Sequence, residues 1–159
     1  MTIFKKTKGF SLIELLVTIA IIGILTAIVV TNMTQPRAKS RDAKRVSDLA
    51  QMQLALELYF DRCNKYPAVS GNDPVLTESC VGSGVTLQTF LSQLPTEPTT
   101  VSGDVYEYRT NATPATDYVL RAKMETNNTA IMQDDVDGTI FSSVDCADSP
   151  NYYYCVQPR

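Results

Sequence analysis

The feature that most constrains this chain is a long, largely apolar run from Phe10 to Val30. Its 21 residues include one charged side chain, Glu14. A helix of this length rises about 30 Å, which matches the hydrocarbon core of a bilayer. Because three lysines lie within the first eight residues, we expect a membrane-spanning helix whose N-terminus stays in the cytoplasm.

Two simpler interpretations of the run fit less well. A secretory signal peptide has an apolar region of about 7–15 residues followed by small residues at its cleavage site. This run is longer, and no such site follows it. A plain membrane anchor has no use for Glu14, because a carboxylate inside the bilayer costs roughly 2.5–3.5 kcal/mol. Glu14 is therefore a candidate functional residue that needs a positive partner.

The residues around Gly9 form a specific pattern, Lys-Gly-Phe-Ser-Leu-Ile-Glu-Leu, from Lys8 to Leu15. This order resembles the signal of type IV prepilins and of type II secretion pseudopilins, in which a basic leader ends in glycine before an aromatic residue. The resemblance implies that a membrane-embedded prepilin peptidase cuts between Gly9 and Phe10 and methylates the new amino group of Phe10. It also implies that the apolar helix assembles subunits into a filament.

Within this resemblance, Glu14 is the fifth residue of the mature chain and gains a partner. The new ammonium group of Phe10 is a positive charge at the start of the same helix. Each charge is costly alone in lipid, and the two stabilise each other as a pair. We expect Glu14 of one subunit to neutralise Phe10 of its neighbour, which sets the axial register between them.

A second helical segment is expected after the apolar run. Residues 38–60 lack Pro and Gly and are rich in good helix formers. Pro36 is expected to kink or weaken the helix near residues 32–36. Apolar residues recur at three- and four-residue steps, interrupted by Gln53. The predicted apolar stripe contains Val46, Leu49, Ala50, Leu54, Leu56, Leu58 and Phe60.

These patterns divide the chain into four parts. Residues 1–9 are a leader, 10–31 the transmembrane and assembly helix, 32–61 its amphipathic continuation, and 62–159 an extracytoplasmic globular domain. We expect an α+β fold in which the long helix packs on a small antiparallel sheet. This is also the architecture that the resemblance implies.

Five basic residues surround Asp42 at the start of the amphipathic segment. They are Arg37, Lys39, Arg41, Lys44 and Arg45. They form either a solvated helix face or a contact with anionic lipid or with acidic patches of neighbouring subunits. On charge alone they compete with the leader lysines over orientation. We expect the N-terminus inside, because the leader must reach a cytoplasm-facing peptidase.

The globular domain shows short, separate patterns. Residues 118–125 alternate in polarity, which predicts a half-buried strand. Residues 104–109 alternate weakly, and residues 129–133 follow a turn as a possible returning strand. Residues 85–94 have leucine and phenylalanine at helical spacing, which predicts a short packing helix.

The four cysteines are Cys63, Cys80, Cys146 and Cys155. An even number behind a membrane segment favours disulfides formed outside the cytoplasm, with buried free thiols as the alternative. Three pairings are possible, and we favour the sequence-local one, 63 with 80 and 146 with 155. The second loop contains three tyrosines, which either bind a partner or pack on the sheet.

An acidic turn lies near the C-terminus, with Asp134, Asp135 and Asp137 ahead of Gly138. Carboxylates are ligands that Ca²⁺ prefers. The spacing excludes an EF-hand loop. Major pseudopilins carry a calcium site in their C-terminal loops, so the resemblance supports a calcium hypothesis. A solvated turn without metal is the alternative.

Other function classes find little support. The net charge of −3 and a pI near 4.9 are unlike those of a nucleic-acid binder. The chain contains no histidine to act as a base, no Gly-x-Ser-x-Gly and no dinucleotide-binding fingerprint. We therefore expect a structural subunit and not an enzyme.

The stretch Lys65-Tyr66-Pro67 after the helix resembles the helix-to-loop junction of the major pseudopilin of type II secretion and of short pilins. It favours the pseudopilin, with a type IV pilin for adhesion, motility or DNA uptake as the alternative. Implied partners are further copies of the chain, prepilin peptidase, an assembly platform, minor pilins or pseudopilins, and lipid before assembly. The implied location is the inner membrane and then a periplasmic or cell-surface filament.

Overall fold

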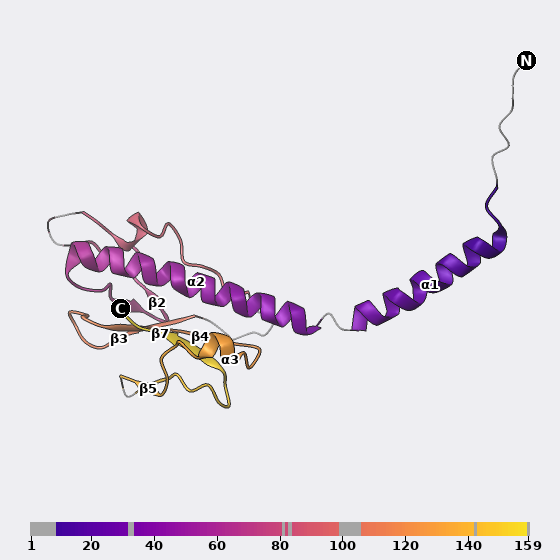
Figure 1. Cartoon of the computed structure of the whole chain (residues 1–159). Coiled ribbons are helices and arrows are strands. Elements are labelled where there is room, and N and C mark those ends of the chain that lie inside the picture. The colour runs from indigo at the N-terminus through magenta and orange to yellow at the C-terminus, as the bar shows by residue number, and fades with distance from the viewer. Residues whose placement is uncertain are drawn as a thin grey trace, which may run out of the picture. The chain divides into compact units, whose positions relative to one another are not determined.

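The computed structural model describes residues 9–31, 34–80, 82, 84–98, 106–141 and 143–158 (Figure 1). The chain forms two compact units, Met1–Arg37 and Ala38–Arg159. Helices α1 (Leu12–Thr31) and α2 (Thr34–Cys63) make up the described part of the N-terminal helical region. The weakening expected near residues 32–36 falls partly on residues 32 and 33, which lie outside the described residues.

Helix α1 is apolar on all of its faces. Its segment Leu12–Val30 has a mean hydropathy of 2.7, and none of it is buried in the chain's own interior. Among the described residues it is the one helix that is long and apolar enough to cross a bilayer. A cleavable signal sequence shares both properties, so the helix alone does not identify the segment.

Helix α2 buries one face and exposes the opposite one. The buried face includes Leu49, Met52, Leu56 and Tyr59, at alternating three- and four-residue steps. The predicted stripe was only partly right, because it included Ala50, Leu54 and Leu58, which are exposed. The predicted stripe combined residues from the buried and the exposed face of α2, because both faces carry apolar residues.

The central sheet has three antiparallel strands in the order β3-β4-β7. Strand β4 (Tyr118–Lys123) lies between β3 (Glu107–Thr110) and β7 (Tyr153–Val156). Leu120 of β4 lies opposite Tyr108 of β3. The helices and the small antiparallel sheet confirm the predicted α+β class.

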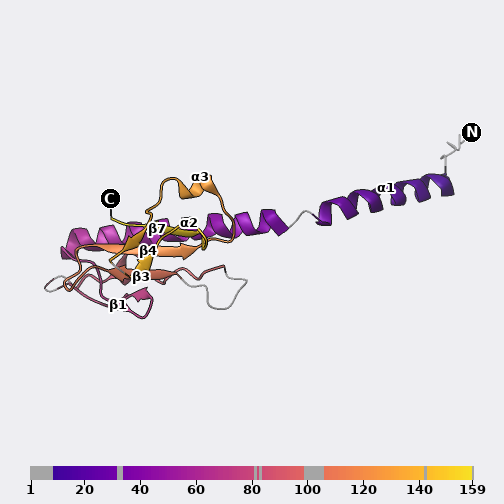
Figure 2. The same cartoon turned by 90° about the horizontal axis from the view of Figure 1, so that it is seen from below.

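The main core lies between α2 and one face of this sheet, and Figure 2 shows α2 running along the strands. Three aromatic rings fill its end: Tyr66 stacks on Phe60 and meets Tyr118 edge-on, with centroids 4.5 and 4.6 Å apart. Such pairs add to the stability gained from burial itself. The fully buried apolar residues of this core include Leu49, Met52, Leu56, Tyr59, Leu87, Tyr108, Tyr118, Leu120 and Ala122.

A second, smaller core covers the other face of the sheet. Val119 of β4 packs there with Val144, Cys146 and Cys155. Its cover comes from the C-terminal segment, which contains the short ladder β5 (Thr139–Ile140) and β6 (Val144–Asp145). Because both faces are covered, β4 is more buried than the half-buried strand that its alternating sequence predicts.

Two predicted elements are wrong. The predicted returning strand at 129–133 is a helical turn, α3 (Thr129–Met132), capped by Asn128, whose side chain accepts the N–H of Ala130 at 3.3 Å. The predicted helix at 85–94 is only the 3-10 turn η1 (Leu87–Thr89). Oγ1 of Thr89 accepts the N–H of Thr86 at 3.3 Å, a contact that caps the start of this turn.

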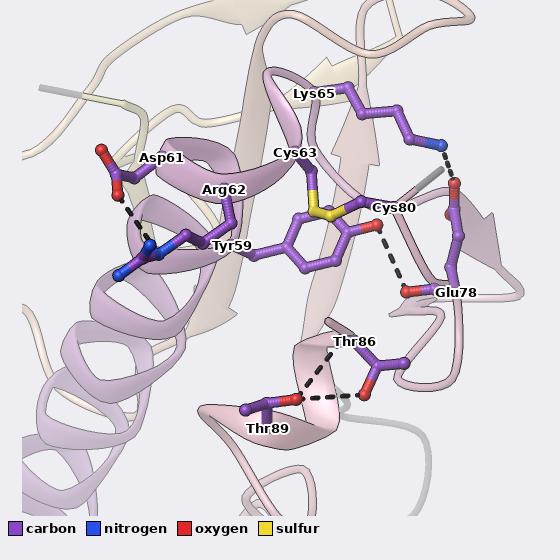
Figure 3. The surroundings of a disulfide bond; sticks show 9 residues. All are labelled: Tyr59, Asp61, Arg62, Cys63, Lys65, Glu78, Cys80, Thr86 and Thr89. Atoms are coloured by element: carbon purple, nitrogen blue, oxygen red, sulfur yellow. Dashed lines mark hydrogen bonds and ion pairs between the residues drawn. A yellow bond between two sulfur atoms is a disulfide. The ribbon is translucent and has the colours of Figure 1, made fainter. Parts of the chain in front are cut away.

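The first disulfide closes the loop after α2. Cys63, the last residue of α2, is joined to Cys80, with Cα atoms 5.2 Å apart (Figure 3). Glu78 reinforces the closure: its carboxylate pairs with Lys65, and its carbonyl accepts the hydroxyl of Tyr59 at 3.3 Å. The loop also contains the short ladder of β1 (Val69–Ser70) and β2 (Asp73–Pro74).

The second disulfide joins Cys146 to Cys155, with Cα atoms 5.8 Å apart. It holds the C-terminal segment against strand β7. Both disulfides therefore follow the sequence-local pairing. In the loop closed by the second disulfide, Tyr153 and Tyr154 are half-buried strand residues. The guanidinium of Arg121 lies 4.2 Å from the centre of the Tyr153 ring.

Candidate functional site

The junction before α1 is fully exposed. Gly9 and Phe10 precede the helix in irregular structure, and the Phe10 side chain is 78% exposed. The Ser11 N–H donates to Oε2 of Glu14 at 2.9 Å, and the Leu15 N–H donates to the Ser11 carbonyl at 3.2 Å. Glu14 therefore lies in the first helical turn, where its negative charge is favoured by the helix dipole.

This geometry places two chemical groups at one helix end. The peptide bond between Gly9 and Phe10 lies outside the helix, where no helical hydrogen bond has to break for it to be reached. The Glu14 carboxylate is one turn away on an apolar helix with no other charged residue. The leader residues 1–8, with their three lysines, lie outside the described residues.

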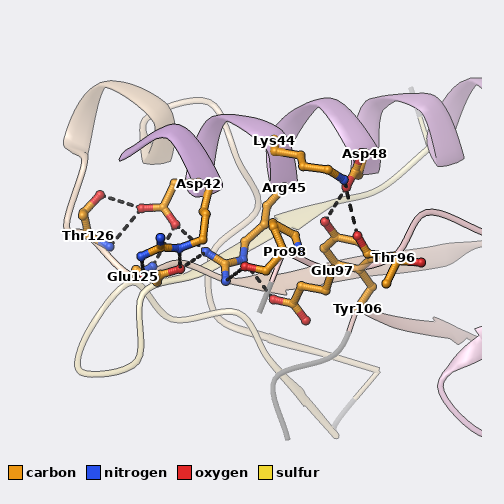
Figure 4. A network of polar contacts seen from close by, with 11 residues as sticks. Asp42, Lys44, Arg45, Asp48, Thr96, Glu97, Pro98, Tyr106, Glu125 and Thr126 are labelled. Atoms are coloured by element: carbon orange, nitrogen blue, oxygen red, sulfur yellow. Dashed lines mark hydrogen bonds and ion pairs between the residues drawn. The ribbon is translucent and has the colours of Figure 1, made fainter. Parts of the chain in front are cut away.

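A buried polar network lies along the N-terminal half of α2 (Figure 4). At its centre is Arg45, whose side chain is 1% exposed. Its guanidinium pairs with the carboxylates of Asp42, Glu97 and Glu125, and each N···O distance is 2.9 Å. Arg41 adds a second guanidinium, at 2.5 Å from Glu125. One buried cation thus joins three segments that are far apart in sequence.

Asp42 ties α2 to the turn that follows β4. Its carboxylate accepts the N–H groups of Glu125 and Thr126, at 2.9 and 3.0 Å, and the Thr126 hydroxyl at 2.6 Å. Further along α2, Asp48 accepts the hydroxyl of Tyr106 at 2.7 Å. Burial, together with this carboxylate, raises the pKa of Tyr106 above its usual range.

The network lowers the pKa of Glu125, which lies at its edge. Hydrogen bonds from Arg41 and Arg45 lower the pKa of Glu125 to about 2, and they outweigh the opposing effect of burial. The hydrogen bond between Arg41 and Glu125 also raises the pKa of Arg41. Both groups are therefore charged at neutral pH, and the pair is a fixed feature of the fold.

The network corrects the interpretation of the basic cluster. Arg41 and Arg45 pair with carboxylates of distant segments, and Arg45 is buried, so these two are not part of a free basic face; Lys44 pairs with Asp48, but its side chain is 51% exposed. Arg37 and Lys39 are exposed. A sequence signal did exist: extending the buried steps 59, 56, 52 and 49 toward the N-terminus leads to residue 45 and then 42.

Three carboxylates converge near the second disulfide. Oxygens of Asp135, Asp137 and Asp148 lie within 4.8 Å of one another. Asp148 lies inside the disulfide loop, and Oδ2 of Asp135 accepts the N–H of Cys155 at 3.0 Å. Burial, with repulsion from Asp148 and Asp137, raises the pKa of Asp135 to about 6.

The predicted ligand set is therefore partly corrected. Asp134 is not part of this group, and Asp148, which sequence reasoning missed, takes its place. No sequence signal could find Asp148, because the disulfide and the fold of the C-terminal segment bring it to Asp135.

Comparison with known proteins identifies the N-terminal segment first. Residues 4–30 match the family model described as the prokaryotic N-terminal methylation motif. The chain is 30% identical over 97 residues to the type II secretion system core protein G of Escherichia coli, covering 58% of this chain and 67% of that protein.

The chain belongs to the type IV pilin-like family.

Other relatives of this pilin-like chain match over a shorter length. It is 38% identical over 63 residues to core protein G of Aeromonas hydrophila, covering 40% of this chain and 44% of that protein. It is 34% identical over 61 residues to the type IV major pilin protein PilA of Myxococcus xanthus, covering 28% of that protein. The chain thus spans less than half the length of these two relatives. No solved structure matches it significantly.

The Escherichia coli match reaches beyond the helices of the pilin-like chain. A match over 58% of the chain is longer than residues 1–63, which end with α2. It therefore includes part of the globular domain. The methylation motif implies processing by a prepilin peptidase, and proteins of this family are structural subunits of filaments.

Proposed function

We propose that this chain is the precursor of a filament subunit that is cut between Gly9 and Phe10 and methylated on the Phe10 amino group. The single observation that carries this proposal is the junction: an exposed Gly-Phe bond, Glu14 in the first helical turn, and an apolar helix that buries nothing within its own chain. The matched methylation motif covers the same residues.

The helix needs two environments in turn. Before assembly, the exposed apolar surface of α1 requires lipid, and its length fits one crossing of the bilayer. After assembly, the same surface requires other subunits. We propose an inner-membrane precursor with its leader in the cytoplasm and its globular domain outside. The two disulfides support that side, because disulfides persist in oxidising compartments.

Among filament types, we propose the major pseudopilin of a type II secretion system. The Escherichia coli match, which reaches the globular domain, supports this version. A type IV pilin of a surface fibre is the second candidate, favoured by the match to PilA of Myxococcus xanthus. Prepilin peptidase, an assembly platform and minor subunits are the partners that either version requires.

We further propose that Asp135, Asp137 and Asp148 hold a calcium ion. Three carboxylates are suitable ligands for this ion. Two of their buried oxygens, Oδ1 of Asp135 and Oδ1 of Asp148, have no hydrogen-bond partner among the described residues. A bound cation would supply the missing positive charge and would join the acidic turn to the disulfide loop.

The intact mass of the mature protein tests the central proposal. We expect the membrane-extracted chain to lack residues 1–9 and to carry one added methyl group on Phe10. A chain that keeps its leader in a host with active prepilin peptidase would refute the proposal. In a deletion strain, retention of secreted proteins supports the pseudopilin, whereas loss of surface fibres supports the pilin.

A further inference from the structure

Positive charge is concentrated at the start of α2. Residues 34–45 contain five basic residues and one acidic residue, which gives a net charge of +4. Residues 46–159 contain six basic and fifteen acidic residues, which gives a net charge of −9. The acidic domain therefore carries one basic segment, and this segment lies next to the apolar helix in the sequence.

The fold uses only part of this positive charge. Arg41 and Arg45 pair with carboxylates of distant segments. In the part of the chain that the structure describes, Arg37 and Lys39 are exposed and have no acidic partner. Lys44 has an acidic partner one turn along the helix, but its side chain is still 51% exposed. We call Arg37, Lys39 and Lys44 the basic collar.

The basic collar shares its part of the helix with no exposed acid. Asp42 and Asp48 lie in the same turns, and both are buried. Every exposed charged side chain between residues 35 and 56, all of which the structure describes, is therefore positive. Arg37 and Lys44 are seven residues apart and lie on one side of α2, whereas Lys39 lies on nearly the opposite side. The collar thus presents positive charge around the helix.

The collar also lies close to the end of the proposed membrane span. Helix α1 ends at Thr31 and α2 begins at Thr34. Even with a fully extended connection between them, Arg37 is at most about 17 Å from Val30, the last residue of the span. The headgroup layer extends about 5–8 Å beyond the hydrocarbon core, and long basic side chains reach toward it. Because charges act over about 8–10 Å at physiological salt, the headgroups are within electrostatic range of the collar.

An anionic lipid surface fits the collar better than an acidic protein surface does. The collar follows a membrane span directly, so headgroups lie near it from the moment of insertion, whereas an acidic protein must first be brought there. Residues 46–159, with their net charge of −9, are repelled by an anionic surface. Each basic residue near such a surface adds attraction. The collar is therefore the part of the domain that can approach anionic lipid.

We propose that the basic collar binds anionic phospholipid headgroups on the extracytoplasmic face of the membrane before assembly. Removal of the leader takes away three lysines, Lys5, Lys6 and Lys8, which hold the cytoplasmic end of α1. The collar then supplies the anchor at the opposite end and fixes the depth of α1 in the bilayer. The inference rests on the membrane topology proposed above and names the lipid class that holds the mature subunit.

Photochemical cross-linking to lipid tests the inference. The mature full chain carries a photoreactive phenylalanine analogue in place of Ser40, an exposed residue between Lys39 and Lys44. It is inserted into vesicles that contain equal amounts of phosphatidylglycerol and phosphatidylcholine, and lipid adducts are identified by mass spectrometry after illumination. In about 20 mM salt, phosphatidylglycerol adducts should exceed phosphatidylcholine adducts about threefold or more, and the excess should shrink in about 0.5 M salt. Equal amounts of the two adducts at low salt overturn the inference.

A pair of substitutions ties the lipid preference to the collar. Arg37→Gln with Lys39→Gln removes two exposed cations that have no acidic partner, so the melting temperature should not change. The excess of phosphatidylglycerol adducts should fall by about half or more. Arg62→Gln is the matched control, because it removes an exposed charge from the other end of α2, and it should keep the full excess. A double variant with an undiminished excess overturns the inference, as do adducts formed mainly with a second copy of the chain, which would make the collar a protein contact.

The outcomes separate this inference from the proposed function. A chain that inserts with its globular domain outside, but shows no preference for anionic lipid, overturns the inference and leaves the filament function intact. If the chain in its native host keeps its leader or is absent from the membrane, the proposed function itself fails.

Discussion

Arg45 and its carboxylates show how a buried charge is tolerated in this domain. The guanidinium contacts Asp42, Glu97 and Glu125, so its loss of hydration is offset by charged hydrogen bonds on several sides. Such a network contributes little net stability compared with apolar packing, but it admits few alternative arrangements. Here it defines where the start of α2 sits on its domain.

The lowered pKa of Glu125 predicts a pH dependence of stability. Its folded-state pKa of about 2 lies below its ordinary value of 4.5. The stabilising contribution is therefore fully present above about pH 4.5 and is lost as pH falls toward 2. We expect Glu125→Gln to lower the free energy of unfolding at pH 6, and the difference from wild type to shrink below pH 4.5. Urea unfolding across this pH range measures the difference in the free energy of unfolding. A constant difference down to pH 2 would contradict the lowered pKa of Glu125.

At the carboxylate cluster, calcium should raise the melting temperature of the protein after removal of divalent ions. A ligand at 100 times its dissociation constant stabilises the folded state by about 2.7 kcal/mol. Asp135→Asn and Asp148→Asn should abolish the shift. The amide oxygen introduced by Asp135→Asn can still accept the Cys155 N–H, so the backbone contact survives.

The neighbouring substitution Asp134→Asn is the matched control. It removes the same charge from the same turn but leaves the three converging carboxylates in place. It should keep the calcium shift. An equal loss of the shift in this variant would mean that the stabilisation by calcium depends on the net charge of the turn and not on a specific site.

At the scale of elements, the two helices have different roles. Helix α1 makes no hydrophobic core of its own, whereas α2 packs on a sheet and keeps one outward face uncharged. A helix that is apolar all round requires lipid or protein on every side. The pair therefore combines an assembly element with a carrier of the globular domain.

The role proposed for Glu14 predicts an assembly defect without a folding defect. Glu14→Ala leaves the Phe10 ammonium without a partner and removes the carboxylate that caps the first turn. We expect normal membrane insertion and a strong loss of filaments, seen by electron microscopy of sheared preparations. Glu14→Asp is the matched control: it keeps the charge and should retain more assembly than Glu14→Ala. Filaments at normal yield in Glu14→Ala would refute the role.

At the scale of the whole molecule, the domain is a three-layer structure with a helix, a small sheet and a C-terminal segment (Figure 1). A domain of this size buries only a modest core, and it compensates with cross-links. One disulfide closes the loop after α2, and the other holds the C-terminal segment on the sheet.

Removing the second disulfide should loosen one layer and leave the other intact. Cys146→Ser with Cys155→Ser opens a loop closed over a sequence separation of nine, and we expect a loss of about 2–4 kcal/mol in the free energy of unfolding. The calcium shift should weaken in the same variant, because Asp148 is then no longer held near Asp135. Hydrogen exchange would locate the change in residues 129–156; uniform loosening of α2 would contradict this division into layers.

The sequence by itself determined the features that depend on neighbours in the chain. A largely apolar run of 21 residues, a basic leader ending at Gly9, and Glu14 at a set distance indicate the family, and residue order alone defines them. The fold class and the strand around residue 120 also follow from local periodicity.

Tertiary structure decided the features that depend on residues far apart in the chain. The buried face of α2 could not be separated from its exposed apolar face, since Leu56 and Leu58 look alike until the sheet covers one of them. Asp148 joins Asp135 only through the fold of the disulfide loop. Arg45 became a core residue because Glu97 and Glu125, from two distant segments, join Asp42 of its own helix around it, and burying a charge is favourable only where such partners meet.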